Sequence, residues 1–129
     1  FTVTLKDYID MVGMVIRDLA REGNVVIAGR GGQALLHDMP GAVHVQIVAP
    51  FEQRVSVLAE RDGISQEEAA RSVKASDQAR RDYVRRYHGV DWLDPTLYDM
   101  VINTNKIPIS LAASMIVDAF RQLQAPDHG

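Results

Sequence analysis

Apolar and polar positions follow one another along the chain in two patterns, one typical of helices and one typical of strands. Across residues 5–19, apolar side chains return every three or four positions, which predicts a helix that ends near Gly23. Short apolar runs with β-branched residues predict buried strands at residues 25–29, 42–50 and 98–105. Further helices are expected at residues 32–39, 51–62, 65–87 and 109–123, the third of them starting at the capping box Ser65-Gln-Glu-Glu68.

The order of these elements predicts an α/β fold in one domain that covers residues 1–129. Strands that are connected by helical crossovers pair in parallel, so the sheet is expected to be mainly parallel. A chain of 129 residues is long enough for one domain with a substantial core. Three strands make a thin sheet for this class of fold.

Composition and charge narrow the classes of function. The net charge of -3 argues against a large surface for nucleic acid or acidic membranes, so any basic site must be local. The chain has no cysteine, which excludes disulfides and thiolate metal sites and favours a reducing, cytoplasmic setting. No apolar run approaches membrane-spanning length, and the four histidines lack the spacing of metal ligands. We therefore expect a cytoplasmic protein with no membrane partner, no nucleic-acid partner and no metal held by histidine or cysteine ligands.

The turn after the first expected strand carries the first candidate binding residue. In "NVVIAGRGGQALL", residues 24–36, Arg30 stands among glycines at the carboxyl end of a strand, where ligands collect in open α/β sheets. Its guanidinium suits a phosphate or a carboxylate, and the glycines let a ligand approach the backbone. The alternative is a solvated arginine at a helix entry. The helix dipole disfavours a cation there, which favours a binding role.

The long polar helix carries a second candidate, a basic cluster between residues 71 and 87. Four charged residues share one face through spacings of three and four: Lys74, Asp77, Arg81 and Arg85. One interpretation is a solvated helix with ion pairs worth roughly 0.2–0.5 kcal/mol each. The other is a mobile segment that grips phosphate during phosphoryl transfer. Arg54 and Arg61 on the preceding helix would face the same ligand if that helix leads from the sheet into the basic segment.

Three stretches taken together resemble a known family. They are "NVVIAGRGGQALLHDMPGAVHVQIVAPFEQRV", then "ERDGIS", then "KASDQARRDYVRRYHGVDWLDPTLYDMVINT". Their order and spacing are similar to those of the cytidylate-kinase-like proteins, within the P-loop nucleoside monophosphate kinases, over nearly the whole chain. The resemblance implies a three-layer P-loop-kinase-like domain with a lid-like helical segment at about residues 63–95.

The resemblance also implies roles for individual residues. The Gly-Arg-Asp that contacts the nucleoside monophosphate in these kinases reads Gly29-Arg30-Gly31 here, with glycine in place of the acidic residue. The implied residues are Arg30, Gly31, Asp77 and Arg80 for the acceptor nucleotide, Arg54, Arg81 and Arg85 for donor phosphates in the lid, and Asn103 and Thr104 for the donor base. ATP and Mg²⁺ are implied as cofactors, and a (d)CMP-type nucleoside monophosphate as the acceptor.

One element of the family pattern is missing from this chain. No Gly-x-x-x-x-Gly-Lys-Ser/Thr occurs in it, although this loop cradles the donor phosphates and its hydroxyl helps to hold Mg²⁺. In the family, the strand before that loop lies between the strands that correspond to residues 25–29 and 42–50. The sheet is therefore expected to be incomplete at its P-loop strand. Three remedies are open: direct pairing of the remaining strands, a partner chain such as a second copy, or an upstream P-loop segment.

Two functions from different classes remain open. The first is the acceptor-binding and lid part of an ATP-dependent nucleotide kinase, inactive alone because the P-loop is absent. The second is a non-catalytic, kinase-derived module for ligand sensing or protein interaction.

Overall fold

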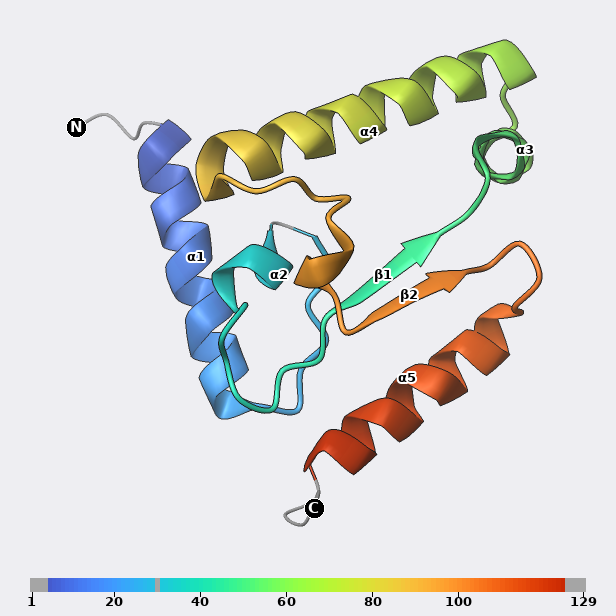
Figure 1. Ribbon diagram of the computed structural model, residues 1–129. Coiled ribbons are helices and arrows are strands. Elements are labelled where there is room, and N and C mark those ends of the chain that lie inside the picture. Colours follow the sequence, from blue (N-terminus) through green and yellow to red (C-terminus); the bar gives the residue numbers. More distant parts are fainter. Residues whose placement is uncertain (1–4, 30, 125–129) are drawn as a thin grey trace.

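The structure is a computed structural model that describes residues 5–29 and 31–124, and the chain forms helices around a small parallel sheet (Figure 1). The helices are α1 (Leu5–Glu22), α2 (Gly32–Leu35), α3 (Phe51–Asp62), α4 (Gln66–His88) and α5 (Ile109–Gln124). The strands are β1 (Val45–Val48) and β2 (Met100–Asn103), and one turn of 3-10 helix, η1 (Pro95–Leu97), precedes β2.

The sheet confirms that the strands pair in parallel across helical connections. β1 and β2 run side by side with Val45 opposite Met100 and Val48 opposite Asn103. The chain between them forms α3 and α4, the crossover that parallel pairing requires. Both strands are shorter than the apolar runs that predicted them. The carboxyl ends of β1 and β2 therefore meet at one edge of the sheet, where α3 begins.

The predicted strand at residues 25–29 is wrong, because those residues lie outside any strand. Val26 is 96% exposed, although its β-branched side chain suggested a buried position. A strand is held by backbone hydrogen bonds to a neighbour, and among the described residues β1 pairs with β2 alone. Direct pairing between residues 25–29 and residues 42–50, one of the three remedies considered, is therefore also wrong. The second edge of β1 is open in the described part of the chain.

Helices α3 and α4 pack against each other with a small core of their own, and α3 is seen end-on in Figure 1 while α4 runs across the view. Val55 and Ala59 of α3 pack with Ala69 and Val73 of α4, and all four side chains are buried. Gly63 ends α3 in a left-handed conformation (φ 65°), which is accessible to glycine at little cost. The Ser65 hydroxyl accepts a hydrogen bond from the Glu68 amide at 3.1 Å, which confirms the predicted capping box. From this turn α4 crosses the molecule towards one end of α1 (Figure 1).

Large apolar side chains remain exposed on several elements. Ile47 of β1 is 52% exposed, while Ile102, opposite it on β2, is buried. Exposed apolar residues also occur along α1 and α5: Tyr8, Met11, Met14, Val15, Leu19, Ile109, Leu111, Met115, Val117, Phe120 and Leu123. Exposed apolar surface of this extent is typical of faces that contact another segment or another protein.

Across residues 5–29 and 31–124, no helix combines the length and the apolar character that a bilayer crossing requires.

Candidate functional site

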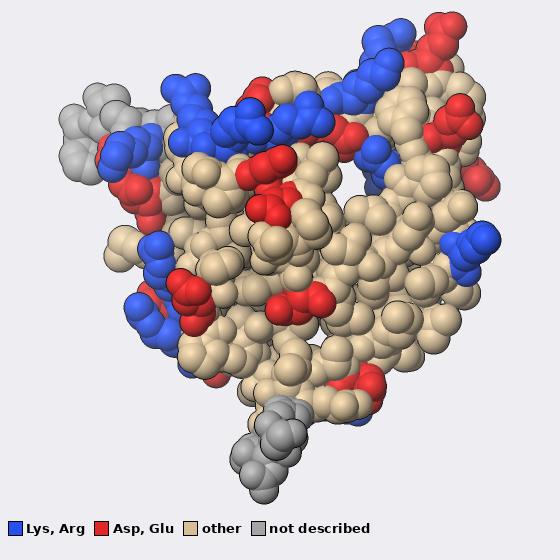
Figure 2. Space-filling model, viewed as in Figure 1, with Lys and Arg blue, Asp and Glu red and all other residues tan. Residues whose placement is uncertain are grey.

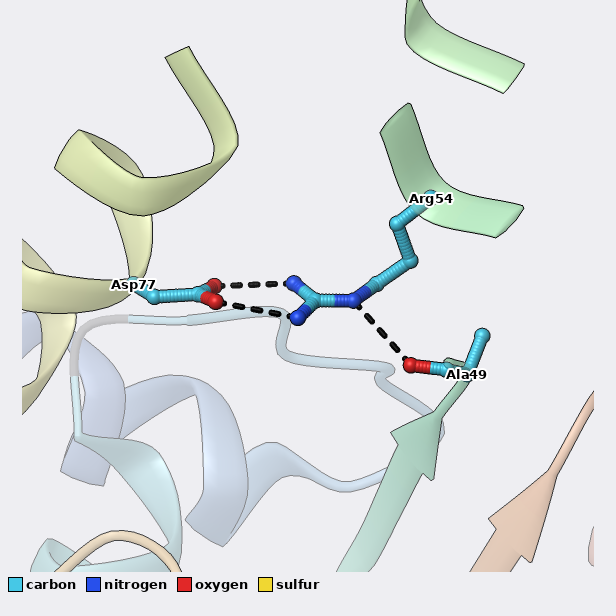
Figure 3. A network of polar contacts seen from close by, with 3 residues as sticks. All are labelled: Ala49, Arg54 and Asp77. Carbon is cyan, nitrogen blue, oxygen red and sulfur yellow. Dashed lines mark hydrogen bonds and ion pairs between the residues drawn. The ribbon is translucent and has the colours of Figure 1, made fainter. Parts of the chain in front are cut away.

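Arg54 joins three elements at the carboxyl edge of the sheet. It lies in the first turn of α3, directly after β1, so its side chain can reach back to the end of that strand. Its Nη1 and Nη2 atoms donate to the two carboxylate oxygens of Asp77 on α4, at 2.9 and 3.0 Å, and Nε donates to the Ala49 carbonyl at 3.1 Å (Figure 3). The paired N–H groups and carboxylate form a two-pronged contact with directional as well as electrostatic strength. Arg54 therefore ties α4 to α3 and to the end of β1.

A shallow hollow opens beside this ion pair. It has a volume of about 370 Å³ and is lined by Phe51, Lys74, Asp77, Gln78 and Arg81. The Lys74 ammonium lies 5.7 Å from the centre of the Phe51 ring, a cation–π contact that holds the lysine at the wall. Because Arg54 neutralises Asp77, the charges of Lys74 and Arg81 are left in excess. The hollow thus attracts anions at the carboxyl edge of the sheet.

The basic side chains of α4 extend beyond this hollow. They are Arg71, Lys74, Arg80, Arg81, Arg85 and Arg86, all of them exposed. Figure 2 shows Lys and Arg side chains in a row along the edge of the molecule where α4 runs. Arg85 lies one turn beyond Arg81 on this helix, outside the lining of the hollow. Of the residues predicted to hold donor phosphates, Arg81 lines the hollow, whereas Arg54 and Arg85 do not.

Arg80 belongs to a different cluster, although it stands only three positions from Asp77. Its guanidinium carbon lies 5.0 Å from the centre of the Trp92 ring. The backbone carbonyl of Trp92 accepts a hydrogen bond from the Tyr98 hydroxyl at 2.5 Å, and that hydroxyl accepts one from Gln33 Nε2 at 3.4 Å. Burial raises the pKa of Tyr98, which keeps the hydroxyl protonated as a donor. Arg80 and Asp77 therefore have different partners in this structure, Trp92 for the former and Arg54 for the latter.

Gly31 lies against the end of α4. Its backbone is left-handed (φ 72°), and a Cβ at this position would overlap the His88 imidazole. The Gly31 carbonyl accepts hydrogen bonds from the amides of Ala34 and Leu35, at 2.9 and 3.0 Å, which begins α2. The neighbouring Arg30 lies outside the described residues. The glycine turn and the far end of the lid-like segment are therefore in direct contact.

Asn103 and Thr104 lie at the same edge of the sheet as Arg54. Thr104 donates to the Val48 carbonyl through its backbone amide at 2.9 Å and through its hydroxyl at 3.3 Å. The Asn103 side-chain oxygen accepts the Asn105 amide at 2.9 Å. These contacts fix the turn after β2 next to the end of β1.

Two residues that line the hollow, Phe51 and Gln78, were not among the candidates from sequence. Phe51 carried no signal beyond its place at a helix start after Pro50. Lys74 was expected on the same helical face as Asp77, although the resemblance implied no individual role for it. Among the described residues, no three His, Asp or Glu side chains lie together in a group that could hold a metal ion.

The Tyr98 hydroxyl provides a test of the loop that supports Trp92. Tyr98→Phe removes the donor to the Trp92 carbonyl, and we expect the free energy of unfolding to fall by about 1 kcal/mol, as is usual for one hydrogen bond. Urea unfolding measures this change. Tyr87→Phe, which removes a hydroxyl from a tyrosine whose ring packs beside Tyr83, is the control. Equal losses of unfolding free energy in the two variants would contradict a stabilising role for the Tyr98–Trp92 hydrogen bond.

The chain is similar in sequence to a known protein family and to several curated proteins. Residues 3–106 match the profile of the cytidylate kinase-like family. A cytidylate kinase from Ignicoccus hospitalis is 34% identical over 104 residues, covering 79% of this chain and 60% of that protein. Cytidylate kinases from Sulfolobus acidocaldarius and Pyrococcus horikoshii are 33% and 34% identical, covering 65% and 69% of this chain and 46% and 45% of theirs. The chain spans about half the length of these curated relatives.

A solved structure has a similar fold. It is an uncharacterized protein from Eubacterium ventriosum, which superposes with a TM-score of 0.84 at 24% sequence identity. The match covers 93% of this chain and 68% of that one. At this identity the likeness concerns the fold alone.

Proposed function

Because the chain belongs to the cytidylate kinase-like family, we propose that it forms the acceptor-binding and lid part of a nucleotide kinase. The reaction is transfer of a phosphoryl group from ATP to a nucleoside monophosphate of the (d)CMP type. One observation carries the proposal: an anion-attracting hollow, bordered by the Arg54–Asp77 pair, lies at the carboxyl edge of a parallel sheet. That edge is where ligands bind in folds of this class.

The proposed roles divide the site between two nucleotides. Arg54, Arg81 and Arg85 hold donor phosphates, with Lys74 added because it lines the same hollow as Arg81. Arg30 and Gly31, with Asp77 and Arg80, hold the acceptor. Asn103 and Thr104 border the donor base. In phosphoryl transfer such residues act by position and charge, because the negative charge on the transferring group has to be offset.

The residues present suit a polyphosphate better than they suit magnesium. Lys74 and Arg81 supply positive charge, and arginine matches phosphate oxygens with paired donors. The chain carries no P-loop lysine and hydroxyl, and its described residues gather no acidic or histidine cluster for a cation. We therefore propose that a P-loop segment outside these 129 residues, upstream or on a partner chain such as a second copy, supplies the Mg²⁺ and ATP cradle.

The open edge of β1 supports this completion. A P-loop strand placed there would pair with β1 and cover Ile47, which is now half exposed. Edge strands with exposed apolar side chains are prone to pair with other chains. The same segment would offer residues 25–29 the neighbour they now lack.

A second candidate function is a non-catalytic module that binds an anionic ligand or a protein. The exposed apolar residues of α1 and α5 favour it, because they suit protein contact as well as they suit a missing strand and helix. The two functions differ in one respect that can be measured: only a kinase acceptor site selects a nucleobase.

Calorimetric titration with CMP tests the proposal. We expect CMP to bind and AMP to compete poorly, and Arg30→Ala to weaken CMP binding by about tenfold or more, since a charged hydrogen bond to phosphate is worth roughly 1.5–3 kcal/mol. Arg21→Ala, which removes an exposed arginine that pairs with Asp18 on α1, is the control and should leave CMP binding unchanged. No binding at millimolar CMP by the folded chain would contradict the acceptor site and favour the non-catalytic module.

A further inference from the structure

The Asp77 carboxylate, which pairs with Arg54, is a negative charge that the protein itself supplies at the edge of the anion-attracting hollow. Asp77 lines that hollow together with Lys74 and Arg81, and its carboxylate engages Arg54 through two nearly equal contacts, at 2.9 and 3.0 Å. A phosphate group would engage a guanidinium in the same way, with two oxygens on two N–H groups. The carboxylate thus occupies the donors that a phosphate would use.

The pair is accessible to an incoming ligand. The Arg54 and Asp77 side chains are 36% and 23% exposed, so neither is sealed in the core. Solvent reaches the pair and screens part of its Coulomb attraction, while the two-pronged geometry keeps its directional strength. A ligand with several negative charges, facing Lys74 and Arg81 as well, can therefore compete with a single carboxylate.

The exchange has a structural consequence. Besides the apolar contacts near the α3–α4 turn, the ion pair is what ties the middle of α4 to the end of β1, since Arg54 also donates to the Ala49 carbonyl (Figure 3). The core residues Ala69 and Val73 lie in the first two turns of α4, before Asp77.

The last turns of α4 have contacts of their own, because Val84 is buried and His88 lies against Gly31. Loss of the pair would therefore free the middle of α4, between these contacts and the core, to shift relative to the sheet.

We propose that Asp77 is an internal counter-ion, which a polyphosphate displaces from Arg54, and that the displacement releases the middle of α4 from the sheet edge. The inference deepens the proposed function and rests on it in one respect: the polyphosphate is identified with that of the donor nucleotide. Asp77, once released, becomes available to the acceptor nucleotide. Binding of the donor would then prepare the acceptor site.

Inorganic tripolyphosphate without magnesium tests the exchange, because it has no base and needs no P-loop. Asp77→Asn keeps the shape of the side chain but removes its charge, and we expect tripolyphosphate to bind about tenfold more tightly. Asp82→Asn removes the same charge from the same helix, where the carboxylate accepts a hydrogen bond from Gln78, and should change binding less than threefold. Calorimetry at low and fixed ionic strength gives both affinities.

Weaker or unchanged binding by Asp77→Asn would overturn the proposal, because Asp77 would then orient Arg54 for the ligand or play no part. Equal gains in both variants would also overturn it, since the effect would be one of net charge. These outcomes are independent of CMP binding, so failure here can be told apart from failure of the acceptor site.

The wild-type chain offers a second measurement that requires no variant. Trp92 is the single tryptophan, and Arg80 of α4 lies over its ring. Release of α4 should move Arg80 and give a saturable change in tryptophan fluorescence as tripolyphosphate binds. Binding heat with constant fluorescence would show that α4 stays in place, and the release would be refuted.

Discussion

The chain of 129 residues on its own is expected to form no measurable CDP from CMP and ATP. Kinases turn over at about 1–100 per second, and that rate depends on a lysine and on magnesium held at the donor phosphates. The described residues supply positive charge at the hollow but no cluster that would hold the metal ion. Direct chromatographic detection of CDP, with a long incubation, measures the rate. We expect it to lie more than about 10⁴-fold below the kinase range.

The matched experiment restores the missing part. The same chain preceded by, or mixed with, a P-loop segment that carries the Gly-x-x-x-x-Gly-Lys-Ser/Thr pattern should gain CDP formation, and replacement of its lysine by alanine should abolish the gain. An ordinary kinase rate from the chain alone would refute the proposal that a separate P-loop segment supplies the cradle for ATP and Mg²⁺. Restored binding without turnover would favour the non-catalytic module.

Replacement of Gly31 by alanine is expected to destabilise the fold by about 3 kcal/mol. Two costs add at this position. A left-handed backbone costs a residue with a Cβ about 1–2 kcal/mol, and the new methyl group would force the half-buried His88 ring to shift, at about 1–3 kcal/mol. Urea or thermal unfolding measures the loss. Because the glycine turn precedes α2, CMP binding should weaken as well.

Two companion variants separate the costs. Gly23 has a similar backbone conformation (φ 77°) with open space around it, so Gly23→Ala should show the conformational cost alone, about 1–2 kcal/mol. The double variant Gly31→Ala with His88→Ala should lose less than the sum of the single changes, because the methyl group then enters the space of the ring. Strict additivity would mean that the imidazole is not the obstacle.

The sequence predicts the helices well because their signals are local. Residues 51–62 form α3 with the predicted bounds, and the Ser65 cap begins α4 as expected. Hydrophobic spacing, glycine terminators and capping residues all act within a few positions. Parallel pairing followed from the order of the elements, and β1 and β2 confirm it.

The failure at residues 25–29 has the opposite cause. The apolar run "VVIAG" fits a strand in every local respect, yet a strand exists only if a neighbour supplies hydrogen bonds. That neighbour is not encoded by the run itself. A local pattern therefore indicates only that a segment is able to form a strand. In this structure residues 25–29 form none, and Val26 is 96% exposed.

The sequence indicated several residues of the site but not which of them contact one another. Helical spacing placed Lys74 and Arg81 on the face of Asp77, and the structure brings them to one hollow. The partner of Asp77 came from another helix, because Arg54 and Asp77 meet only through the turn angle between α3 and α4. Arg80 is close to Asp77 in sequence, yet its side chain contacts Trp92. Closeness along the helix therefore did not predict the partner.

The compact α3–α4 pair also bears on the order in which the chain folds. Its apolar contacts join residues that are near one another along the chain, so closing them costs little chain entropy and can happen early. Pairing of β1 with β2 has to wait for the whole crossover to fold, because Val45 meets Met100. The pair is thus a candidate for an independent cooperative unit, whose local opening need not disrupt the sheet. A segment that assembles first and opens separately is well placed to serve as the moving part of a binding protein.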